Sequence, residues 1–561
     1  MIMVTDLKKL AYKCALNNAV KHGGKAKESA VIGMIFSLEP KFRKNVQEVI
    51  QATKDAVKKV NKMEKDEQIK ELERIGKIKS KRKEKKEELE ELPEPHKNVV
   101  MRFAPSPSGP LHIGHARAAI LNYEYTKRYN GKLIIRIEDT DPKKVYPDAY
   151  EMIPEDLEWL GVKYDEIVVQ SDRIPIYYDI AKEVIKRNGG YICTCEPEKF
   201  RNLRDKSIPC PCRNNSVEEN LEKWEQMFEM DEGEAVLRIK TDLKHKNPAV
   251  REWVAMRIVD AEHPRVGDKY RVFPTMNFAV AVDDHLMGMT HVLRGKDHLA
   301  NTEKQKYLYK HMEWEPPVFI HYGRVMIEDS QLSTSNIRKK IEKGEYSGWD
   351  DPRLGTLRAL KRRGIKPEAL KKLILEIGIK MADVTVSWEK IYGFNRNIVE
   401  KEANRYFFVP NPKKVKIKGL PKNFEGKVVK RPLHPDFHER GYRKLTINKC
   451  VYLPTEDISG DGINFRLIDA INVKFEENDV IYHSKSLEDA HKIKAKMIQW
   501  LPCDEVIKAK VIMPDASVVK GVVEKNILKE KTNDIVQLER FGFARIDKID
   551  KNEITLYYSH K

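Results

Sequence analysis

Between residues 98 and 141, hydrophobic and polar positions follow two different periods. The run N-V-V-M-R-F-A at 98–104 is short and apolar, as in a buried strand. After a loop rich in proline and glycine, apolar residues recur at Ala116, Ile120 and Tyr123, the spacing of one helix face. A second apolar run, K-L-I-I-R-I, stands at 132–137. Strand, helix and strand in this order predict a β-α-β unit, and therefore a parallel sheet with a right-handed crossover.

Elsewhere the pattern separates helical from β-rich parts of the chain. Residues 5–90 and 352–392 show helical periodicity, whereas short alternating runs such as K-V-K-I-K-G and E-I-T-L-Y-Y follow residue 400. The spacing of these runs predicts barrels rather than a layered sheet. The apolar runs F-A-V-A-V-D-D-H and T-H-V-L-R-G, at 278–285 and 290–295, are predicted to be buried strands.

We expect a multidomain α/β protein built on a parallel-sheet catalytic domain of the Rossmann type, since 561 residues are enough for several domains. The expected order is a helical extension at 1–97, the first half of the catalytic domain at 98–190, an insertion at 191–272, the second half at 273–345, a helical region at 346–400 and β-barrels at 401–561.

The charge of the chain favours a polyanionic partner. Lys and Arg number 104 against 86 Asp and Glu, a net charge of +18, and such an excess gains free energy by displacing counterions from phosphates. A lysine-rich bias of the whole proteome would give the same excess, so charge alone leaves nucleic-acid binding open. Apolar runs are too short to span a membrane, and M-I-M-V-T-D-L-K-K-L has no secretory pattern. We expect a cytoplasmic monomer that does not bind a membrane.

The loop R-F-A-P-S-P-S-G-P-L-H-I-G-H-A-R, at 102–117, combines backbone breaks with two histidines. A loop that enters a helix from a parallel strand presents unpaired N–H groups in the ligand crevice of the sheet. Gly109 and Gly114 let a ligand approach the backbone, and His112 and His115, one turn apart, can face the same anion. The alternative is a pair of surface histidines in a tight turn, and a bare H-x-G-H would favour that alternative.

The stretch resembles the nucleotide-binding motif of class I aminoacyl-tRNA synthetases, named HIGH, which stands here at 112–115. Its longer form resembles the glutamyl and glutaminyl branch of that class. R-I-E-D-T-D at 136–141, V-D-D-H-L-M-G-M-T-H-V-L-R-G-K-D-H at 282–298 and G-W-D-D-P-R-L at 348–354 resemble the same branch. The helical N-terminus and the β-rich C-terminus resemble its archaeal glutamyl members.

This resemblance implies a class I catalytic fold and a two-step reaction. L-glutamate attacks the α-phosphorus of ATP, with Mg²⁺ present, to give glutamyl-adenylate and pyrophosphate, and the terminal ribose of tRNA then takes the acyl group. The implied RNA partner is tRNA(Glu), with charging of tRNA(Gln) left open. The insertion would then bind the acceptor stem, the helical region would contact the stem, and the barrels would read the anticodon.

The same resemblance implies a set of site residues. They are His112 and His115 for stabilising the transferring phosphate, Arg102, Ala104, Ser106, Glu138 and Arg294 for the amino acid, and Gly109 and Gly114 for ATP. Glu138 would receive the substrate's amino group, because an ammonium needs a counter-charge in a partly desolvated pocket. A structural carboxylate at a strand end is the alternative for this residue.

A second phosphate-handling loop of the class, K-M-S-K-S, is matched by Q-L-S-T-S at 331–335. The resemblance implies catalytic roles for Ser333 and Ser335 and ATP contacts for Leu332 and Thr334. The archaeal glutamyl form tends to read L-S-T-S-K here, so this chain departs from it.

This chain lacks the lysine of that pattern, because Asn336 stands where the lysine is expected. Neither Thr334 nor Asn336 can supply a cation. Arg338 and Lys339 follow at once and would substitute if the loop curls, with Mg²⁺ carrying more of the charge.

Four cysteines form two C-x-C pairs around one loop: Cys193, Cys195, Cys210 and Cys212. Four thiolates are a natural tetrahedral zinc set, and in a reducing compartment such grouping favours metal over disulfides. C-x-C is a less ideal spacing than C-x-x-C, and the resemblance adds that glutamyl enzymes can hold one structural Zn²⁺ in this insertion. We expect Cys14, Cys450 and Cys503 to be ordinary reduced cysteines.

Arg294 bears most directly on the choice of amino acid. By resemblance it faces the substrate side chain, and a guanidinium matches a γ-carboxylate through two charged hydrogen bonds. Its alternative is a structural ion pair with Asp283 or Asp284. Two rival functions stay open: a glutaminyl enzyme, which carries a non-arginine at this position, and a non-catalytic RNA-binding paralogue, favoured by the missing lysine.

Overall fold

The computed structural model describes residues 2–21, 24–39, 42, 45–76, 89–94, 97–328, 333–458, 462–476 and 479–561. The chain forms two compact units, 1–87 and 88–561. The first unit is helical and contains α1 (Ile2–Lys21), α2 (Glu28–Leu38), α3 (Val46–Val60) and α4 (Lys65–Ile75). Among the helices of the described residues, none is long and apolar enough to cross a bilayer.

The second unit begins with the predicted parallel sheet. Strands β1 (Val100–Phe103), β2 (Lys132–Ile137) and β3 (Glu166–Val169) pair in parallel, and α5 (Ile113–Arg128) connects the first two. A second parallel pair is formed by β8 (His291–Gly295) and β9 (Val318–Tyr322). It adjoins β1, because the Thr290 N–H donates to the Val100 carbonyl at 3.0 Å. The parallel α/β core is therefore confirmed.

Between these two parts of the sheet the chain forms an insertion with its own antiparallel sheet. The elements from the end of β2 to the start of β8 are α6 (Ala149–Trp159), α7 (Ile174–Lys186), β4 (Gly190–Cys193), α8 (Pro197–Asp205), α9 (Val217–Gln226), β5 (Val236–Ile239), β6 (Val254–Ile258), β7 (Val272–Pro274) and α10 (Met276–Leu286). Strands β4 to β7 pair in sequence order, and Tyr177, Trp224 and Leu308 belong to the apolar core beside them.

One predicted strand is wrong. The run F-A-V-A-V-D-D-H lies in helix α10, not in a strand. Seven of its eleven residues are buried, so the helix is apolar nearly all round and has no polar face to reveal its period. A short apolar run without periodicity does not distinguish a buried helix from a buried strand. The neighbouring run T-H-V-L-R-G does contain a strand, β8.

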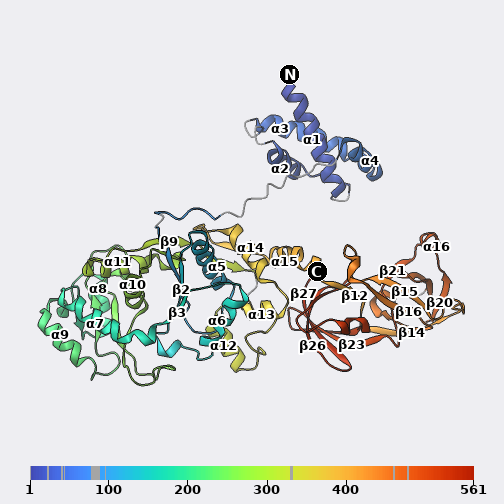
Figure 1. Cartoon of the computed structure of the whole chain (residues 1–561). Helices are drawn as coiled ribbons and strands as arrows, with labels where there is room; N and C mark the ends of the chain where they lie inside the picture. Colours follow the sequence, from blue (N-terminus) through green and yellow to red (C-terminus); the bar gives the residue numbers. More distant parts are fainter. Residues whose placement is uncertain are drawn as a thin grey trace. The chain divides into compact units, whose positions relative to one another are not determined.

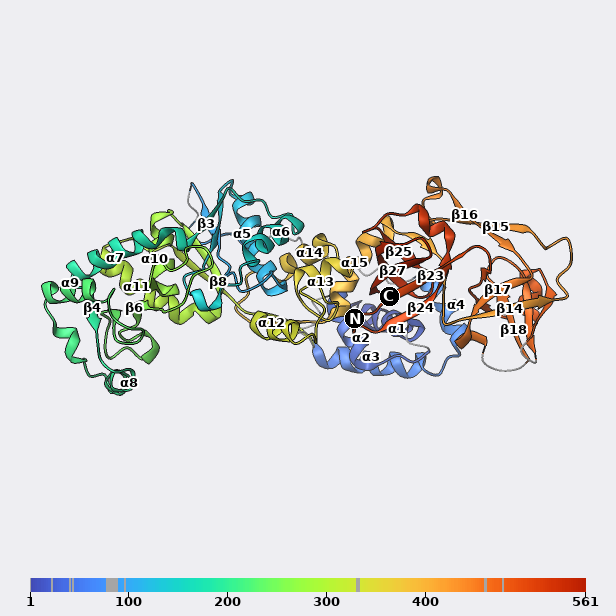
Figure 2. The ribbon, with the colours of Figure 1, turned by 90° about the horizontal axis from the view of Figure 1, so that it is seen from below.

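A helical region connects the parallel α/β core to the β-rich part. The elements after β8 are α11 (Leu299–Met312), β9, β10 (Val325–Ile327), α12 (Thr334–Glu342), α13 (Leu357–Arg362), α14 (Pro367–Ile377), β11 (Val384–Val386) and α15 (Trp388–Glu402). Helix α14 contacts α5, and α15 contacts the β-rich part. Figure 2 shows α13, α14 and α15 between the catalytic elements and these strands.

The C-terminal part consists mainly of two seven-stranded sheets, which agrees with the predicted barrel-like region. The strands are β12 (Asn404–Tyr406), β13 (Phe408–Pro410), β14 (Pro412–Lys418), β15 (Lys427–Pro432), β16 (Tyr442–Ile447), β17 (Cys450–Pro454), β18 (Ile463–Leu467), β19 (Asn472–Glu476), β20 (Asp479–Ser484), β21 (Lys496–Ile498), β22 (Leu501–Pro502), β23 (Val506–Ile512), β24 (Val518–Glu524), β25 (Ile535–Leu538), β26 (Gly542–Ile549) and β27 (Glu553–His560). One short helix, α16 (Leu487–Lys492), lies among them.

Two cysteines of this region were predicted wrongly. Cys450 and Cys503 form a disulfide, with Cα atoms 5.5 Å apart. They lie 53 residues apart in sequence, but β17 and β22 pair and bring them together. Sequence spacing carries no signal for such a pair because the pairing of the strands creates it. Cys14 is a free, buried cysteine, as expected.

Candidate active site

The loop between β1 and α5 carries both predicted histidines at the start of the helix. His112 is the N-cap residue, and its Nδ1 accepts a hydrogen bond from the Gly114 N–H at 3.0 Å. The Nδ1 of His115 accepts from the His112 N–H at 3.3 Å, and the two rings stack with centroids 3.8 Å apart. Because each Nδ1 accepts, the proton of each neutral imidazole lies on Nε2. Each histidine therefore presents an Nε2–H donor.

Burial keeps both imidazoles neutral near pH 7. Desolvation lowers the pKa of His112 to about 4 and lowers the pKa of His115 well below its usual value, with the neighbouring His112 adding to the second shift. A neutral imidazole donates a hydrogen bond without a permanent positive charge, which suits an oxyanion whose charge grows during a reaction. A phosphate at this helix N-terminus would also meet the positive end of the helix dipole.

A later segment of the chain fixes the conformation of this loop. The Leu111 carbonyl accepts from the Leu357 N–H at 2.9 Å, and the Ile113 N–H donates to the Gly355 carbonyl at 3.3 Å. On the other side, Asp156 Oδ2 accepts from the Leu111 N–H at 2.8 Å. These bonds hold the backbone before and after the first histidine. The site therefore has its loop geometry set before any ligand arrives.

Four charged side chains form one buried network beside the loop. The Oδ1 atom of Asp284, in α10, accepts from Arg102 Nε at 3.1 Å and from Arg136 Nη1 at 2.7 Å. Arg136, whose side chain is fully buried, also donates to Glu138 Oε1 at 3.0 Å. The Glu138 side chain is 15% exposed and lines a cavity. Arg136 thus orients the Glu138 carboxylate, and the carboxylate can receive a cation from the cavity.

Arg294 lies at the carboxyl end of β8 and contacts two uncharged acceptors. Its Nη2 donates to Thr302 Oγ1 at 2.6 Å and to Gln305 Oε1 at 2.8 Å. The guanidinium carbon lies 4.9 Å from the centre of the Phe319 ring. Burial, with the positive charge of Arg102 nearby, lowers the pKa of Arg294 to about 10, so the group is still charged at pH 7.

The alternative of an ion pair between Arg294 and either neighbouring aspartate is not what the structure shows. Asp283 accepts from Arg173 Nε at 2.8 Å and from the Tyr177 hydroxyl at 2.7 Å. Asp284 is bonded to the two other arginines of the network. The guanidinium of Arg294 therefore keeps its charge without a carboxylate among its described hydrogen-bond partners.

Both histidines, Arg102, Glu138 and Arg294 line one cavity of about 640 Å³. The predicted residues around it are Arg102, Ala104, Ser106, His112, Gly114, His115, Glu138 and Arg294. Gly109 is not among its lining residues and packs against Trp349. Arg324 also lines the cavity and was not predicted; its Nε pairs with Asp297 at 2.8 Å.

The second predicted loop leads into α12. Ser333 is the N-cap residue of this helix, and Thr334 Oγ1 lies 3.1 Å from Ser108 Oγ of the first loop. Ser333 and Ser335 are exposed. The prediction for Leu332 lies outside the described residues. The two predicted nucleotide-binding loops are thus in contact through one pair of hydroxyl groups.

The side chain of Arg338 is already engaged. It pairs with Glu342 at 3.0 Å within α12, and its guanidinium carbon lies 5.1 Å from the centre of the Tyr146 ring. Residues 334–342 form a regular helix, so both Arg338 and Lys339 lie on α12. The substitution of these cations for the missing lysine, which depends on a curled loop, stays a prediction.

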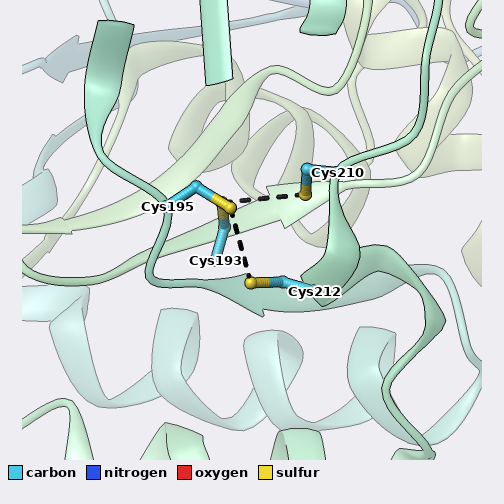
Figure 3. Close-up of side chains that lie close together, drawn as sticks. All are labelled: Cys193, Cys195, Cys210 and Cys212. Carbon is cyan, nitrogen blue, oxygen red and sulfur yellow. Dashed lines mark hydrogen bonds between the residues drawn. The ribbon is translucent and has the colours of Figure 1, made fainter. Parts of the chain in front are cut away.

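The four clustered cysteines converge on one point, as Figure 3 shows. Their sulfur atoms all lie within 4.8 Å of one another, with Cys193 to Cys210 at 3.9 Å and Cys195 to Cys212 at 3.7 Å. Sulfur ligands about 2.3 Å from a tetrahedral Zn²⁺ stand about 3.8 Å apart. The thiol positions therefore fit a closed four-cysteine zinc site between the end of β4 and the segment that follows α8.

Residues 98–401 match the family described as the catalytic domain of class I tRNA synthetases (E and Q), and 403–490 and 497–547 match its two anticodon-binding domains. The chain belongs to the class I tRNA synthetases of the E and Q type. It is therefore an aminoacyl-tRNA ligase of this family, as its HIGH and G-W-D-D-P-R-L stretches predicted.

Relatives of this synthetase family match over the whole chain. Proteins named glutamate–tRNA ligase from Methanothermobacter marburgensis and Methanosphaera stadtmanae are 56% and 55% identical, over 100% and 99% of this chain and 100% of each relative. One from Pyrococcus abyssi is 49% identical over 99% of this chain and 100% of its own length. A solved glutamate–tRNA synthetase from Elizabethkingia anophelis aligns at 25% identity and a TM-score of 0.41, over 54% of this chain and 71% of that one.

For this synthetase, sequence reasoning missed two residues of the buried network, Arg136 and Asp284. Both stand inside strings that were quoted for the resemblance, R-I-E-D-T-D and V-D-D-H. Two consecutive carboxylates in an apolar run were a signal, since a buried carboxylate requires a partner. The partners of Asp284 are seen only in the structure, where its carboxylate contacts Arg102 and Arg136.

Proposed function

We propose that this synthetase is a glutamate–tRNA ligase, which activates L-glutamate with ATP and transfers it to the 3′ end of tRNA(Glu). The observation that carries the proposal is the charged Arg294 in the cavity, bonded only to uncharged acceptors among its described partners. A buried charge of this kind calls for a ligand of opposite charge. The names of the full-length relatives support the same amino acid.

The charges around the cavity suit glutamate as a whole. Arg102 and Arg136 pair with the two carboxylates of Glu138 and Asp284, whereas Arg294 has no carboxylate among its described hydrogen-bond partners. The γ-carboxylate of glutamate would neutralise this guanidinium, and the uncharged amide of glutamine would not. In our proposal Glu138 accepts the substrate ammonium, and Arg294 binds the γ-carboxylate with Arg102, Ala104 and Ser106 nearby.

In the first step an α-carboxylate oxygen of glutamate attacks the α-phosphorus of ATP, and the bond to the β-phosphate breaks to release pyrophosphate. His112 and His115 donate their Nε2–H groups to the phosphate oxygens, on which negative charge grows. Gly114 offers its backbone at the helix start, and Gly109 shapes the approach. Mg²⁺ would neutralise charge on the leaving pyrophosphate.

The second loop completes the nucleotide site in this proposal. Ser333 and Ser335 have catalytic roles at the phosphates of ATP. Leu332 and Thr334 bind ATP. The described contact between Thr334 and Ser108 supports this arrangement, because it joins the loop to the histidine loop. In the second step a hydroxyl of the terminal tRNA ribose attacks the activated carbonyl, and AMP leaves.

We also propose one structural Zn²⁺ on Cys193, Cys195, Cys210 and Cys212. The sulfur spacing supports this. A zinc ion bound by all four thiolates would join the end of β4 to the segment that follows α8. Its role would be folding of the insertion rather than catalysis. The expectations of a cytoplasmic monomer and of a possible second RNA substrate, tRNA(Gln), stay predictions.

The test is amino-acid-dependent exchange of pyrophosphate into ATP, in the presence and absence of tRNA. We expect exchange with glutamate and little with glutamine, and charging of tRNA(Glu). Arg294→Ala should lower kcat/KM for glutamate severely while the KM for ATP changes little, since the guanidinium faces the side chain of the amino acid and not the nucleotide. Absence of exchange with glutamate under all these conditions would favour the non-catalytic paralogue, and exchange with glutamine would favour the glutaminyl enzyme.

A further inference from the structure

Two side chains of helix α11 accept hydrogen bonds from the guanidinium of Arg294. Thr302 and Gln305 stand three residues apart on α11, so their side chains share one face of the helix. Both accept from the same nitrogen, Nη2 of Arg294, at 2.6 Å and 2.8 Å. Thr302 is 4% exposed, Gln305 is 0% exposed and Arg294 is 7% exposed. The three groups are therefore locked by packing as well as by hydrogen bonds.

The hydroxyl of Thr302 is itself fixed. It lies 3.2 Å from the His298 carbonyl, to which it donates, and 2.9 Å from His321 Nε2 on the neighbouring strand β9. The position of Gln305 is likewise set by its place in the buried face of α11. Neither acceptor can follow Arg294 if the guanidinium turns, so the direction of the remaining N–H groups is determined.

Three further buried polar atoms in this neighbourhood have no hydrogen-bond partner among the described residues. They are Arg294 Nε, Gln305 Nε2 and the Tyr309 hydroxyl. Buried donors are normally satisfied, and three in one place indicate that a polar group completes the network. Arg294 itself lines the cavity.

The uncharged nature of the two acceptors has an electrostatic consequence. A carboxylate at either position would neutralise the guanidinium and compete with an incoming carboxylate. An amide oxygen and a hydroxyl fix the orientation and leave the full positive charge for the ligand. A glutamate in place of Gln305 would have nearly the same shape and the opposite effect.

We propose that Gln305 is a specificity-determining positioning residue. Together with Thr302 it orients Arg294 by neutral hydrogen bonds and so keeps the guanidinium available for the side-chain carboxylate of the amino acid. This inference rests on the proposed function, because it assigns glutamate as the ligand of Arg294. Gln305 acts through Arg294 and does not itself touch the substrate.

The decisive variant is Gln305→Glu, which exchanges one NH₂ for an oxygen. We expect the KM for glutamate in pyrophosphate exchange to rise on the order of 10²-fold, the size of effect that follows loss of a buried charge pair. The KM for ATP should stay within about twofold, because the change lies at the amino-acid side of the cavity. The preference for glutamate over glutamine should shrink, because a carboxylate at position 305 would already neutralise Arg294.

Two further variants separate orientation from charge. Gln305→Met removes the acceptor without adding charge, and Thr302→Val removes the other acceptor at nearly constant shape. Each should raise the KM for glutamate less than Gln305→Glu does, on the order of tenfold, as for loss of a hydrogen bond to a charged group. Gln47→Glu, the same substitution at an exposed position of α3, is the matched control and should match the wild type.

The outcomes are distinguishable from those of the proposed function. If the wild type does not exchange with glutamate, the proposed function fails and the inference falls with it. If the wild type is active and Gln305→Glu keeps its KM for glutamate, the inference alone is overturned. If Gln305→Glu does not fold, an unchanged KM for glutamate in both Gln305→Met and Thr302→Val overturns it, and a raised KM in both supports it.

Discussion

Trp349 lies directly over Gly109, so that a Cβ atom at position 109 would stand 2.9 Å from the indole ring. Gly109 has φ +152°, a conformation that side-chain-bearing residues rarely adopt. The contact joins the histidine loop to the G-W-D-D-P-R-L segment. Both the space and the backbone conformation at this position therefore require glycine.

Gly109→Ala should lower kcat/KM for adenylate formation by at least tenfold, because the indole or the loop must move. Gly161→Ala is the matched control: this glycine also has positive φ, +69°, but nothing lies within 4 Å of its Cβ position. The control should lose some stability through backbone strain and keep its rate. Steady-state exchange and thermal unfolding of both variants measure the difference. Equal rates in the two variants would show that the contact does not matter for the reaction.

Acid should destabilise the protein through its buried histidines. An unfolded histidine titrates near pH 6.5, whereas His112 in the folded state has a pKa of about 4. Between these values the unfolded chain binds the proton and the folded chain does not, so stability falls as pH falls from about 6.5 to about 4. His112 alone would contribute up to about 3 kcal/mol of this loss.

His112→Asn tests this contribution, because asparagine caps a helix well and does not titrate. Denaturant unfolding at pH 7 and pH 4.5 should show a smaller acid loss in the variant than in the wild type. The same variant should activate glutamate more slowly, on the order of 10² to 10³-fold, if the imidazole donates to the phosphate. An unchanged acid loss together with a wild-type rate would return His112 to a purely structural role.

The four-cysteine cluster should contain about one equivalent of zinc per chain. Cys195→Ser should lower the zinc content and the melting temperature, because a structural site contributes binding energy to folding. Cys14→Ser, at a buried cysteine far from the cluster in sequence, should leave the zinc content unchanged. Metal analysis of the purified variants measures this directly. A zinc-free wild type with normal stability would contradict the assignment.

The Cys450–Cys503 disulfide should stabilise the C-terminal sheets. Closing a loop with a sequence separation of 53 residues is worth about 4 kcal/mol in the chain-entropy description. Reduction should therefore lower the unfolding midpoint of the wild type. Cys503→Ser should show the lower midpoint at once and should not respond to reductant. Equal thiol counts in reduced and untreated wild-type protein would show that the bond does not form.

The parallel core and its chemistry could be predicted from sequence because they are local. The strand before residue 104, the glycine and proline breaks and the two histidines lie within one short stretch, and their spacing determines the helix start. Helix α10 was mistaken for a strand because burial on all sides removes the polar face that reveals a helix.

Long-range partners could not be predicted in the same way. Arg102 and Asp284 meet only because the fold brings α10 near β1, and Cys450 meets Cys503 only because two short strands pair. Which side chain neutralises which depends on this packing, and no sequence period records it. The uncharged partners of Arg294 are the clearest case, since an ion pair with a neighbouring aspartate was the expected alternative.

The backbone hydrogen bonds between Leu111 and Leu357 and between Ile113 and Gly355 affect how the chain folds during translation. During translation the histidine loop leaves the ribosome long before the segment that holds it has been made. The first strand and helix can form early, but their catalytic turn has no partner until the later segment emerges. A nascent chain that stops before that segment would therefore carry both histidines and still lack the activating geometry.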